Sequence, residues 1–277
     1  MTSPTQAILP VAGLGTRFLP WTKIVPKELL PIGNRPVISL LVDECLSVGI
    51  TDICFVISRG KESILKYFEK DAALEAELTR RGKSDLITEL HRYDSVRFSG
   101  VYQEEQKGDG HAILQAASWV ESDLVAILFG DDLIAGEENG LQQLLRAQEM
   151  AKELGSPKEK AFLLLENVPK ELVSKYGIVD ISEEGSVGRL KKIRSMVEKP
   201  PVEQAPSTLA VVGKYLIPRS TFEILPSVKS GHGGEIRLID ALIAQLGTID
   251  VYGYEFEGKR LDTGRPEGYK EAVMMLV

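Results

Sequence analysis

The chain has little of what a disulfide scaffold needs. Only two of its 277 residues are cysteine, and a chain of this length can bury a large core without covalent staples. Cys45 lies in a helical pattern and Cys54 in an apolar, strand-like run. We therefore expect two reduced, packed thiols and a cytoplasmic protein.

Long apolar segments and an excess of positive charge are also lacking. No apolar run is long enough to span a membrane, and residues 1–6 contain neither a basic region nor a long apolar stretch. We expect no signal peptide and no membrane partner. The net charge of −7 argues against a general nucleic-acid binder, because such proteins neutralise phosphates with excess lysine and arginine. Small anionic substrates remain compatible with a local basic cluster.

Neither internal repeats nor low-complexity tracts divide the chain. Its length allows one or two domains, and α/β folds of this size often form one. The segment closest to a linker, residues 200–206, is interpreted as a surface loop. We therefore expect a single catalytic domain over residues 1–277.

Short apolar strands alternate with helical patterns in the first half of the chain. This alternation predicts an α/β fold, Rossmann-like, with a mixed, mainly parallel sheet and helices on both faces. The second half is richer in strands. The expected strands are residues 7–12, 53–57, 96–102, 124–129, 162–165, 177–181, 187–197, 209–217 and 249–256. The expected helices are residues 36–49, 61–70, 72–93, 110–120, 235–245 and 266–276.

Two loops that suit a phosphate ligand follow expected strands. Gly13-Leu14-Gly15-Thr16-Arg17 comes after the first strand, and Gly130-Asp131-Asp132 comes after residues 124–129. Ligands of such sheets bind at the carboxyl ends of the strands, so both loops are predicted to line one cleft. A lone Gly-x-Gly also fits an ordinary tight turn. It lacks the third glycine of the dinucleotide fingerprint and the Gly-Lys-Ser/Thr ending of a P-loop.

The residues after the glycine loop combine cations with prolines. Arg17, Lys23 and Lys27 lie close together, and three prolines in residues 18–31 prevent a long helix. A solvated basic loop would explain the charges alone. Cations on a stiff loop beside backbone N–H groups suit a triphosphate better.

These residues resemble the signature of the sugar-1-phosphate nucleotidyltransferases, Gly-x-Gly-Thr-Arg followed by Pro-Lys-Glu. Residues 19–31 are most similar to the bacterial UTP–glucose-1-phosphate uridylyltransferases. The resemblance implies a fold of the nucleotide-diphospho-sugar transferase type. It also implies a set of nucleotide-binding residues. They are Ala12, Gly13, Gly15, Thr16, Arg17, Lys27, Gln103, Gly108 and Asp131.

Three further segments acquire roles from the resemblance. Gln103 and Gly108 would read the uracil edge, whereas Gln103 alone could be a surface glutamine. Asp131 and Asp262 would hold Mg²⁺, which prefers oxygen ligands, although each aspartate could instead cap a turn. Thr263, next to Asp262, is typical of the thymidylyltransferase version of the second metal-binding motif. The alternative to a uridylyltransferase is therefore a glucose-1-phosphate thymidylyltransferase that uses dTTP.

The sugar phosphate has its own implied residues: Gly177, Glu198, Lys199 and Gly213. Glu198 would accept hydrogen bonds from sugar hydroxyls, and Lys199 would hold the phosphate as a point charge. Gly177 and Gly213 would let the backbone approach the sugar ring. A surface ion pair is the common alternative for Glu198 and Lys199.

The implied reaction transfers UMP from UTP to glucose 1-phosphate and releases pyrophosphate. The sugar phosphate would attack the α-phosphorus in line, with Arg17, Lys27 and Lys199 as the catalytic cations. The resemblance further implies a homodimer or homotetramer. A catalytically silent nucleotide sensor on the same fold and a nicotinamide-dependent oxidoreductase are the remaining alternatives.

Overall fold

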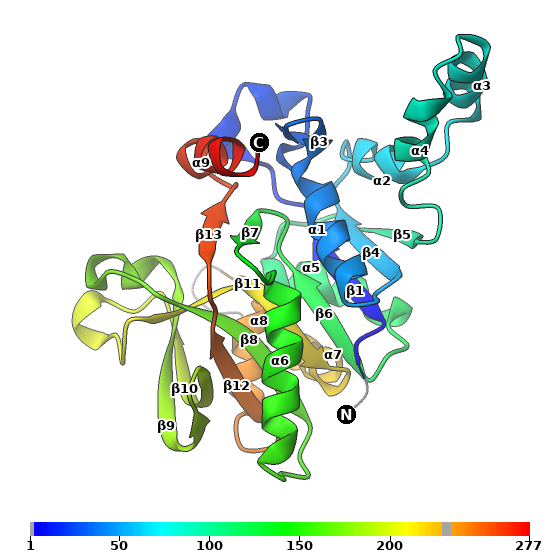
Figure 1. Ribbon diagram of the computed structural model, residues 1–277. Helices are drawn as coiled ribbons and strands as arrows, with labels where there is room; N and C mark the ends of the chain where they lie inside the picture. The colour runs from blue at the N-terminus through cyan, green and yellow to red at the C-terminus, as the bar shows by residue number, and fades with distance from the viewer. Residues whose placement is uncertain (1–2, 229–233) are drawn as a thin grey trace.

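The computed structural model describes residues 3–228 and 234–277. A nine-stranded sheet runs through the molecule in the order β5-β4-β1-β6-β11-β8-β12-β10-β9 (Figure 1). Its strands are β1 (Gln6–Pro10), β4 (Asp52–Ile57), β5 (Arg97–Tyr102), β6 (Leu124–Leu128), β8 (Lys160–Asn167), β9 (Gly177–Val187), β10 (Leu190–Glu198), β11 (Leu209–Pro218) and β12 (Asp250–Glu255). The mixed sheet predicted from the sequence is confirmed.

Parallel pairing is concentrated in the N-terminal part of the sheet. Strand β1 pairs in parallel with β4 and β6, so that Ile8 stands beside both Cys54 and Ile127. Every residue of β4 and β6 is buried, because helices cover both faces of the sheet there. The carboxyl ends of these strands therefore open at one edge, where the glycine loop leaves β1.

Antiparallel pairing dominates the second half. Strand β11 runs antiparallel to both β6 and β8, and β9 and β10 form an antiparallel hairpin. One expected strand, residues 187–197, is in fact divided. Val187 ends β9 and Leu190 begins β10, because Gly188 takes a positive φ of 55° and turns the chain.

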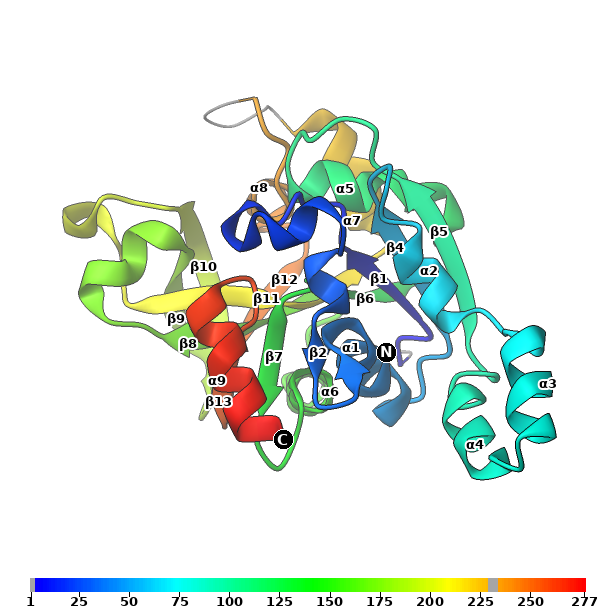
Figure 2. The same cartoon turned by 90° about the horizontal axis from the view of Figure 1, so that it is seen from above.

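Helices pack on the two faces of the sheet and define two cores (Figure 2). On one face lie α1 (Val37–Ser47), α2 (Ser63–Phe68) and α6 (Gly140–Glu153), whose apolar residues join one buried cluster. On the other face lie α5 (Asp109–Gln115), α7 (Ser220–Ile224) and α8 (Leu238–Gln245), which contribute to a second cluster. The predicted helices on both faces are confirmed.

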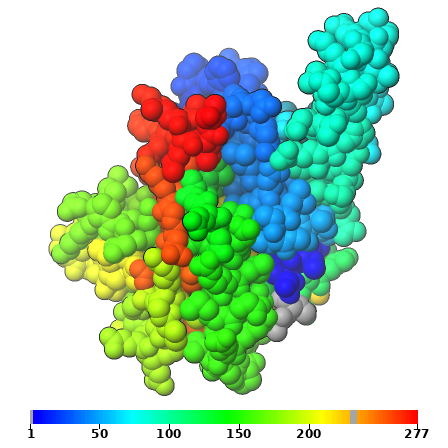
Figure 3. Space-filling model, viewed as in Figure 1, coloured from blue at the N-terminus to red at the C-terminus, as the bar shows by residue number. Residues whose placement is uncertain are grey.

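A short ribbon joins the two halves of the chain. Strand β7 (Asp132–Ala135) pairs antiparallel with β13 (Lys259–Asp262), which places Asp132 opposite Asp262. Helix α9 (Pro266–Leu276) follows, and its surface lies against the N-terminal part of the chain (Figure 3). It lies beside the strand pair β2 (Pro31–Ile32) and β3 (Arg35–Pro36), where Tyr269 Oη donates to Pro31 O at 2.5 Å. The C-terminal segment thus reaches the N-terminal loop.

The helix expected over residues 72–93 is broken. Helix α3 (Ala72–Arg80) ends before Gly82, whose φ is +69°, and a 3-10 turn (Ser84–Leu86) and α4 (Ile87–Leu90) follow. Neither α3 nor α4 has a buried residue, and both stand away from the body of the molecule (Figures 1 and 3). Similarly, the helix expected over residues 110–120 ends at Gln115 and continues as a 3-10 turn.

Helix α6 is not predicted by the apolar periodicity of the sequence. Its signal is a capping box, in which the Asn139 side chain accepts from Gln142 N and the Gln142 side chain accepts from Asn139 N, both at 3.0 Å. Among the described residues, no helix is long and apolar enough to cross a membrane.

Candidate active site

The glycine loop and the cationic loop form one folded unit. Gly15 adopts a φ of +66°, and a Cβ at this position would stand 3.1 Å from Thr22 Cγ2. Thr22 Oγ1 donates to Gly15 O at 2.8 Å, which ties the two loops together. Residues 16–29 form three 3-10 turns rather than a long helix, as the prolines predict.

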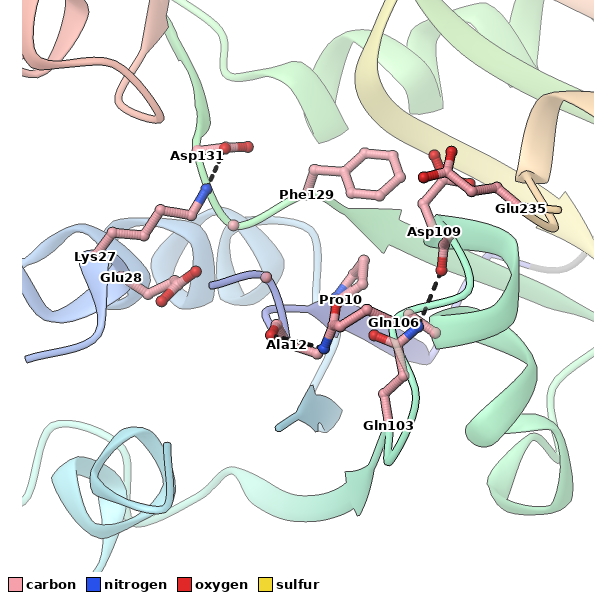
Figure 4. Close-up of a pocket in the computed structure, with 14 residues that line it drawn as sticks. Pro10, Ala12, Lys27, Glu28, Gln103, Gln106, Asp109, Phe129, Asp131 and Glu235 are labelled. Atoms are coloured by element: carbon pink, nitrogen blue, oxygen red, sulfur yellow. Dashed lines mark hydrogen bonds and ion pairs between the residues drawn. The ribbon is translucent and has the colours of Figure 1, made fainter. Parts of the chain in front are cut away.

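A cleft of about 310 Å³ opens at the carboxyl ends of β1 and β6 (Figure 4). Its lining comes from five distant segments, so the single cleft expected from the two loops is confirmed. The lining residues are Pro10, Ala12, Gly13, Lys27, Glu28, Gln103, Gln106, Gly108, Asp109, Ala112, Phe129, Gly130, Asp131 and Glu235.

Lys27 and Asp131 face each other across this cleft as an ion pair (Figure 4). Burial lowers the pKa of Lys27, but the nearby carboxylates of Asp131, Glu28 and Asp132 together raise that pKa above its usual value, with Asp131 contributing most. Burial would raise the pKa of Asp131, yet Lys27 holds it below its usual range. Both groups are therefore charged at neutral pH, which gives the cleft one fixed anion and one fixed cation.

Asp262 lies beside Asp131 because the Asp262-Thr263-Gly264 turn closes on residue 131. Thr263 N and Oγ1 both donate to Asp131 O, at 2.8 and 3.0 Å. A Cβ on Gly264 would stand 2.4 Å from Asp131 Oδ2 and 3.0 Å from Asp262 Oδ1. The carboxylates of Asp131 and Asp262 therefore lie against the same turn, one on each side of Gly264.

The neighbouring carboxylate, Asp132, is directed elsewhere. Its Oδ1 accepts from Arg260 Nε at 2.6 Å and its Oδ2 accepts from Gly213 N at 3.0 Å. A Cβ on Gly213 would stand 2.4 Å from Asp132 Oδ2 and 2.8 Å from Phe129 Cβ, so only glycine fits. Within the described chain, no group of three histidine, cysteine or acidic residues is placed to hold a metal. A cation held here would take further ligands from phosphate and water, as Mg²⁺ commonly does.

The opposite end of the cleft is built around Gln103 and Gly108. Gln103 is buried, and its Nε2 donates to Gly108 O at 3.0 Å. Gly108 has a φ of +97°, and a Cβ there would stand 2.4 Å from Ile236 O. His111 Nδ1 lies 3.1 Å from Gln103 Nε2, which agrees with a packing role for the histidine. An amide and a backbone turn at this end are suited to reading the edge of a base.

Three of the residues predicted for the sugar phosphate, Gly177, Glu198 and Lys199, lie together where β9 begins and β10 ends, whereas Gly213 lies in β11 against Asp132 and Phe129. Lys199 Nζ is 3.2 Å from Glu198 Oε1, and a Cβ on Gly177 would be 3.1 Å from Glu198 Oε2. Among the described non-glycine residues, Lys199 alone has a positive φ, of 46°. Lys199 N donates to Tyr176 O at 2.9 Å, which holds this uncommon conformation.

Arg17 and Lys199 do not line the cleft of Lys27. They line a second hollow of about 750 Å³, and the Gly264 turn lies between the two sites, with Arg17 Nη1 3.4 Å from Gly264 O. The lining residues of this hollow are Arg17, Ser174, Lys175, Lys199, Arg265, Pro266 and Glu267. The three cations predicted to be catalytic are thus divided between adjacent cavities.

Comparison with known proteins decides the family. The sequence model described as nucleotidyl transferase matches residues 6–277. The chain belongs to the nucleotidyl transferase family. A UTP–glucose-1-phosphate uridylyltransferase of Bacillus subtilis is 39% identical over 271 residues, which cover 97% of this chain and 89% of that protein.

Solved structures resemble this nucleotidyl transferase along its whole length. The UTP-bound UGPase from Acinetobacter baumannii has a TM-score of 0.88 and 35% identity, over 99% of this chain and 93% of that one. A UDP-glucose pyrophosphorylase complexed with UDP-glucose has a TM-score of 0.82 and 35% identity, over 99% and 98%. The likeness confirms the predicted fold class.

Several site residues of this nucleotidyl transferase were missed at the sequence level. Glu28 and Lys61 form a buried pair at 2.9 Å below the glycine loop, and Lys61 Nζ also donates to Val11 O at 2.7 Å. Gln106 Nε2 donates to Ala12 O at 3.3 Å. Glu28 belongs to the recognised motif and could have been found there, but Lys61 has no local pattern that would single it out.

Proposed function

We propose that this nucleotidyl transferase transfers UMP from UTP to glucose 1-phosphate, giving UDP-glucose and pyrophosphate. The observation that carries the proposal is the meeting of Lys27, Asp131 and Asp262 around the Gly264 turn, beside the glycine loop. The similar proteins are named for UTP, glucose 1-phosphate or UDP-glucose, over nearly the whole length of this chain.

The carboxylates of Asp131 and Asp262 fit Mg²⁺, since they offer two neighbouring oxygens and leave the remaining positions to phosphate and water. When bound, Mg²⁺ would neutralise charge on the nucleotide phosphates and so favour attack at the α-phosphorus. Lys27 and Arg17 would stabilise the phosphate oxygens. The N–H groups of the glycine loop, from Ala12 to Thr16, would approach the same phosphates.

Residues at the ends of the two cavities would hold the base of the nucleotide and the sugar phosphate. Gln103 and Gly108 would hold the base, in the cleft. On the other side of the Gly264 turn, Lys199 would hold the sugar phosphate, and Glu198 would accept hydrogen bonds from the sugar. Gly177, beside Glu198, would admit the sugar ring close to the backbone, whereas the space at Gly213 is already filled by Asp132 and Phe129.

No general base is required for this chemistry. The second pKa of a phosphate monoester is about 6, so the sugar phosphate is already a dianionic nucleophile near neutral pH. The chain's residues need to position two anions against each other and to offset the charge that builds on the leaving pyrophosphate. Lys27 in the cleft, and Arg17 and Lys199 in the second hollow, supply the positive charge for that task.

The thymidylyltransferase alternative depended on Thr263, and the structure gives this residue a different role. Thr263 is 2% exposed, and both its N and Oγ1 bond to Asp131 O. The turn that Thr263 closes accounts for the residue at this position, and the choice between UTP and dTTP is measured directly by competition.

A pyrophosphate-release assay tests the proposal. The four nucleoside triphosphates and dTTP are each combined with glucose 1-phosphate and with other sugar 1-phosphates. We expect the highest kcat/KM for UTP with glucose 1-phosphate, and UDP-glucose as the main product when UTP and dTTP compete at equal concentration. Faster turnover of dTTP would favour the thymidylyltransferase, and no release from any pair would favour a silent sensor.

The same proposal includes a single catalytic domain over residues 1–277, a cytoplasmic location and a homodimer or homotetramer. Light scattering on the eluting protein measures the oligomer directly. A mass equal to one 30.5 kDa chain at micromolar concentration would contradict the proposed assembly.

A further inference from the structure

Each carboxylate gathered at the β7–β13 ribbon has a cation of its own. Together these cations neutralise a site that would otherwise hold three close negative charges. Two of the cations come from distant parts of the chain, and the third lies three residues after its carboxylate. The pairs are Asp131 with Lys27, Asp132 with Arg260 and Asp262 with Arg265.

The three pairs differ in how freely they can separate. The Asp132–Arg260 side chains are only 8% and 11% exposed, and Arg260 also contacts Glu166 at 3.3 Å, so this pair is closed. The side chains of Lys27 and Asp131 are 16% and 26% exposed, and those of Arg265 and Asp262 are 37% and 25% exposed. The Lys27–Asp131 and Arg265–Asp262 pairs are therefore more open to solvent than the Arg260–Asp132 pair.

Arg265 is held loosely and faces a site suited to phosphate. Its Nε lies 3.0 Å from Asp262 Oδ2, yet this buried nitrogen has no well-aligned hydrogen bond. Its side chain lines the second hollow with Arg17, Lys175 and Lys199. Four cations around one hollow, against a single carboxylate there, favour a multiply charged anion.

We propose that Lys27 and Arg265 are exchangeable counterions, which occupy Asp131 and Asp262 in the free protein and move to substrate phosphates when a metal-bound nucleotide enters. This inference rests on the proposed function and adds Arg265 to the phosphate-binding residues. A divalent cation alone must displace both cations from the carboxylates without giving them a new partner, and it therefore binds weakly. A nucleotide supplies that partner, so metal and nucleotide bind cooperatively.

Mn²⁺, whose free concentration is read from its electron paramagnetic resonance signal, serves as the metal probe. Binding of Mn²⁺ alone is measured first for the wild type and for Arg265→Gln. We expect the variant to bind Mn²⁺ about two- to fivefold more tightly, the range of a partly exposed ion pair. With UTP present, the variant should bind the nucleotide about tenfold more weakly, because a charge-assisted contact is lost.

Two variants serve as matched controls. Lys175→Gln removes one positive charge from the same hollow, and among the described residues Lys175 has no ion-pair partner, so Mn²⁺ affinity should stay close to that of the wild type. Arg265→Lys keeps the cation beside Asp262 and should also bind Mn²⁺ like the wild type. Circular dichroism and thermal melting verify that each variant is folded.

Unchanged Mn²⁺ affinity in Arg265→Gln would overturn the exchange, and so would an equal gain in Lys175→Gln. The proposed function fails in a different way. A wild-type protein that does not bind UTP in the presence of Mn²⁺ refutes the nucleotide assignment, while the comparison with Mn²⁺ alone still decides whether Arg265 competes with the metal.

Discussion

At the scale of single residues, a glycine determines how closely the acidic groups meet. Gly264 has no chemistry of its own, but any Cβ there would overlap Asp131 Oδ2. The absence of a side chain lets the turn fold between the carboxylates of Asp131 and Asp262. The spacing of the Asp131 and Asp262 carboxylates therefore depends on Gly264, which has no side chain.

The first prediction concerns Lys27 and Asp131. Lys27→Ala and Asp131→Ala should each lower kcat for UDP-glucose formation by about a hundredfold or more, since the loss of one charge-stabilising contact typically costs about 3 kcal/mol. Lys23→Ala is the matched control, because Lys23 is exposed on the same loop and lines neither cavity. Near-normal turnover by either folded site variant would refute the assignment.

A second prediction follows from Asp109, which lines the cleft. The surrounding protein atoms desolvate the Asp109 carboxyl and raise its pKa to about 6, although the residue is exposed at the mouth of the cleft. The hydrogen bond from Leu238 N offsets only some of the rise. Because the folded pKa exceeds the unfolded value of 3.8, the native state binds more protons between about pH 4 and pH 6. The contribution of Asp109 therefore lowers stability as the pH rises through that window.

Asp109→Asn should remove this pH dependence while keeping an oxygen for Leu238 N. Urea unfolding at several pH values compares the two proteins. We expect the free energy of unfolding of the variant to gain relative to the wild type as the pH rises from about 4 to 6. Parallel profiles for the two proteins would show that Asp109 does not titrate in this range.

The sequence predicted those site residues that lie in continuous motifs. Lys27, Asp131 and Gln103 stand in such motifs and line the cleft, and Glu198 pairs with Lys199 of the second hollow. Arg260 and the other supporting cations escaped prediction because their roles depend on partners far along the chain. A charged residue in a strand has no sequence pattern that distinguishes a buried partner from a solvated one.

At the scale of elements, a buried ion pair joins three of them. Lys214 in β11 is 0% exposed and bonds to Glu44 of α1 at 2.7 Å. Glu44 Oε1 in turn accepts from Leu141 N, at the start of α6, at 2.8 Å. A Cβ on Gly140 would stand 2.3 Å from Lys214 Cδ, so this helix can begin here only with glycine.

Lys214→Met should destabilise the protein by about 3–5 kcal/mol, because it leaves the Glu44 carboxylate buried without its partner. The double variant Lys214→Met/Glu44→Gln should recover most of the loss, since no buried charge then remains and the amide oxygen at position 44 can still accept from Leu141 N. Urea unfolding of both proteins measures the difference. Equal destabilisation of the single and double variants would mean that the unpaired charge is not the cause.

Elements were predictable where apolar residues recur with a clear period. The strands β4 and β6 and helix α9 agree closely with expectation, because each has a continuous or periodic apolar pattern. Helix α6 has buried glutamines at positions 143 and 148 that obscure its apolar face. Its N-terminal capping box, rather than periodicity, was the usable signal.

At the scale of the whole molecule, two cores on opposite faces of one sheet each protect a cysteine. Cys45 and Cys54 are both 0% exposed and belong to different clusters. Burial raises the pKa of the Cys54 thiol to about 12 and that of Cys45 still further. The expected reduced, packed thiols are confirmed as free and buried.

Neither thiol should react with a disulfide reagent at pH 8 while the protein is folded. In increasing urea, both should become reactive at the midpoint of the unfolding transition, because each core opens only with the sheet between them. Ellman's reagent and circular dichroism follow the two processes. Reaction of one cysteine well below that midpoint would mean that the two faces unfold independently.

The mixed sheet was predictable from the alternation of strands and helices, but the β7–β13 ribbon was not. Its strands have four residues each and are separated by more than a hundred positions. Pairings this short and distant leave no periodic trace. They become visible only once the larger sheet has fixed the surroundings.

That ribbon also sets the order in which the site can come into being during synthesis. A growing chain can complete the strands around the glycine loop and present Asp131 well before residue 262 leaves the ribosome. Until then, half of the acidic pair is missing. Under the proposed function, a partly made chain would lack the second metal-binding carboxylate until β13, the last strand, has been made.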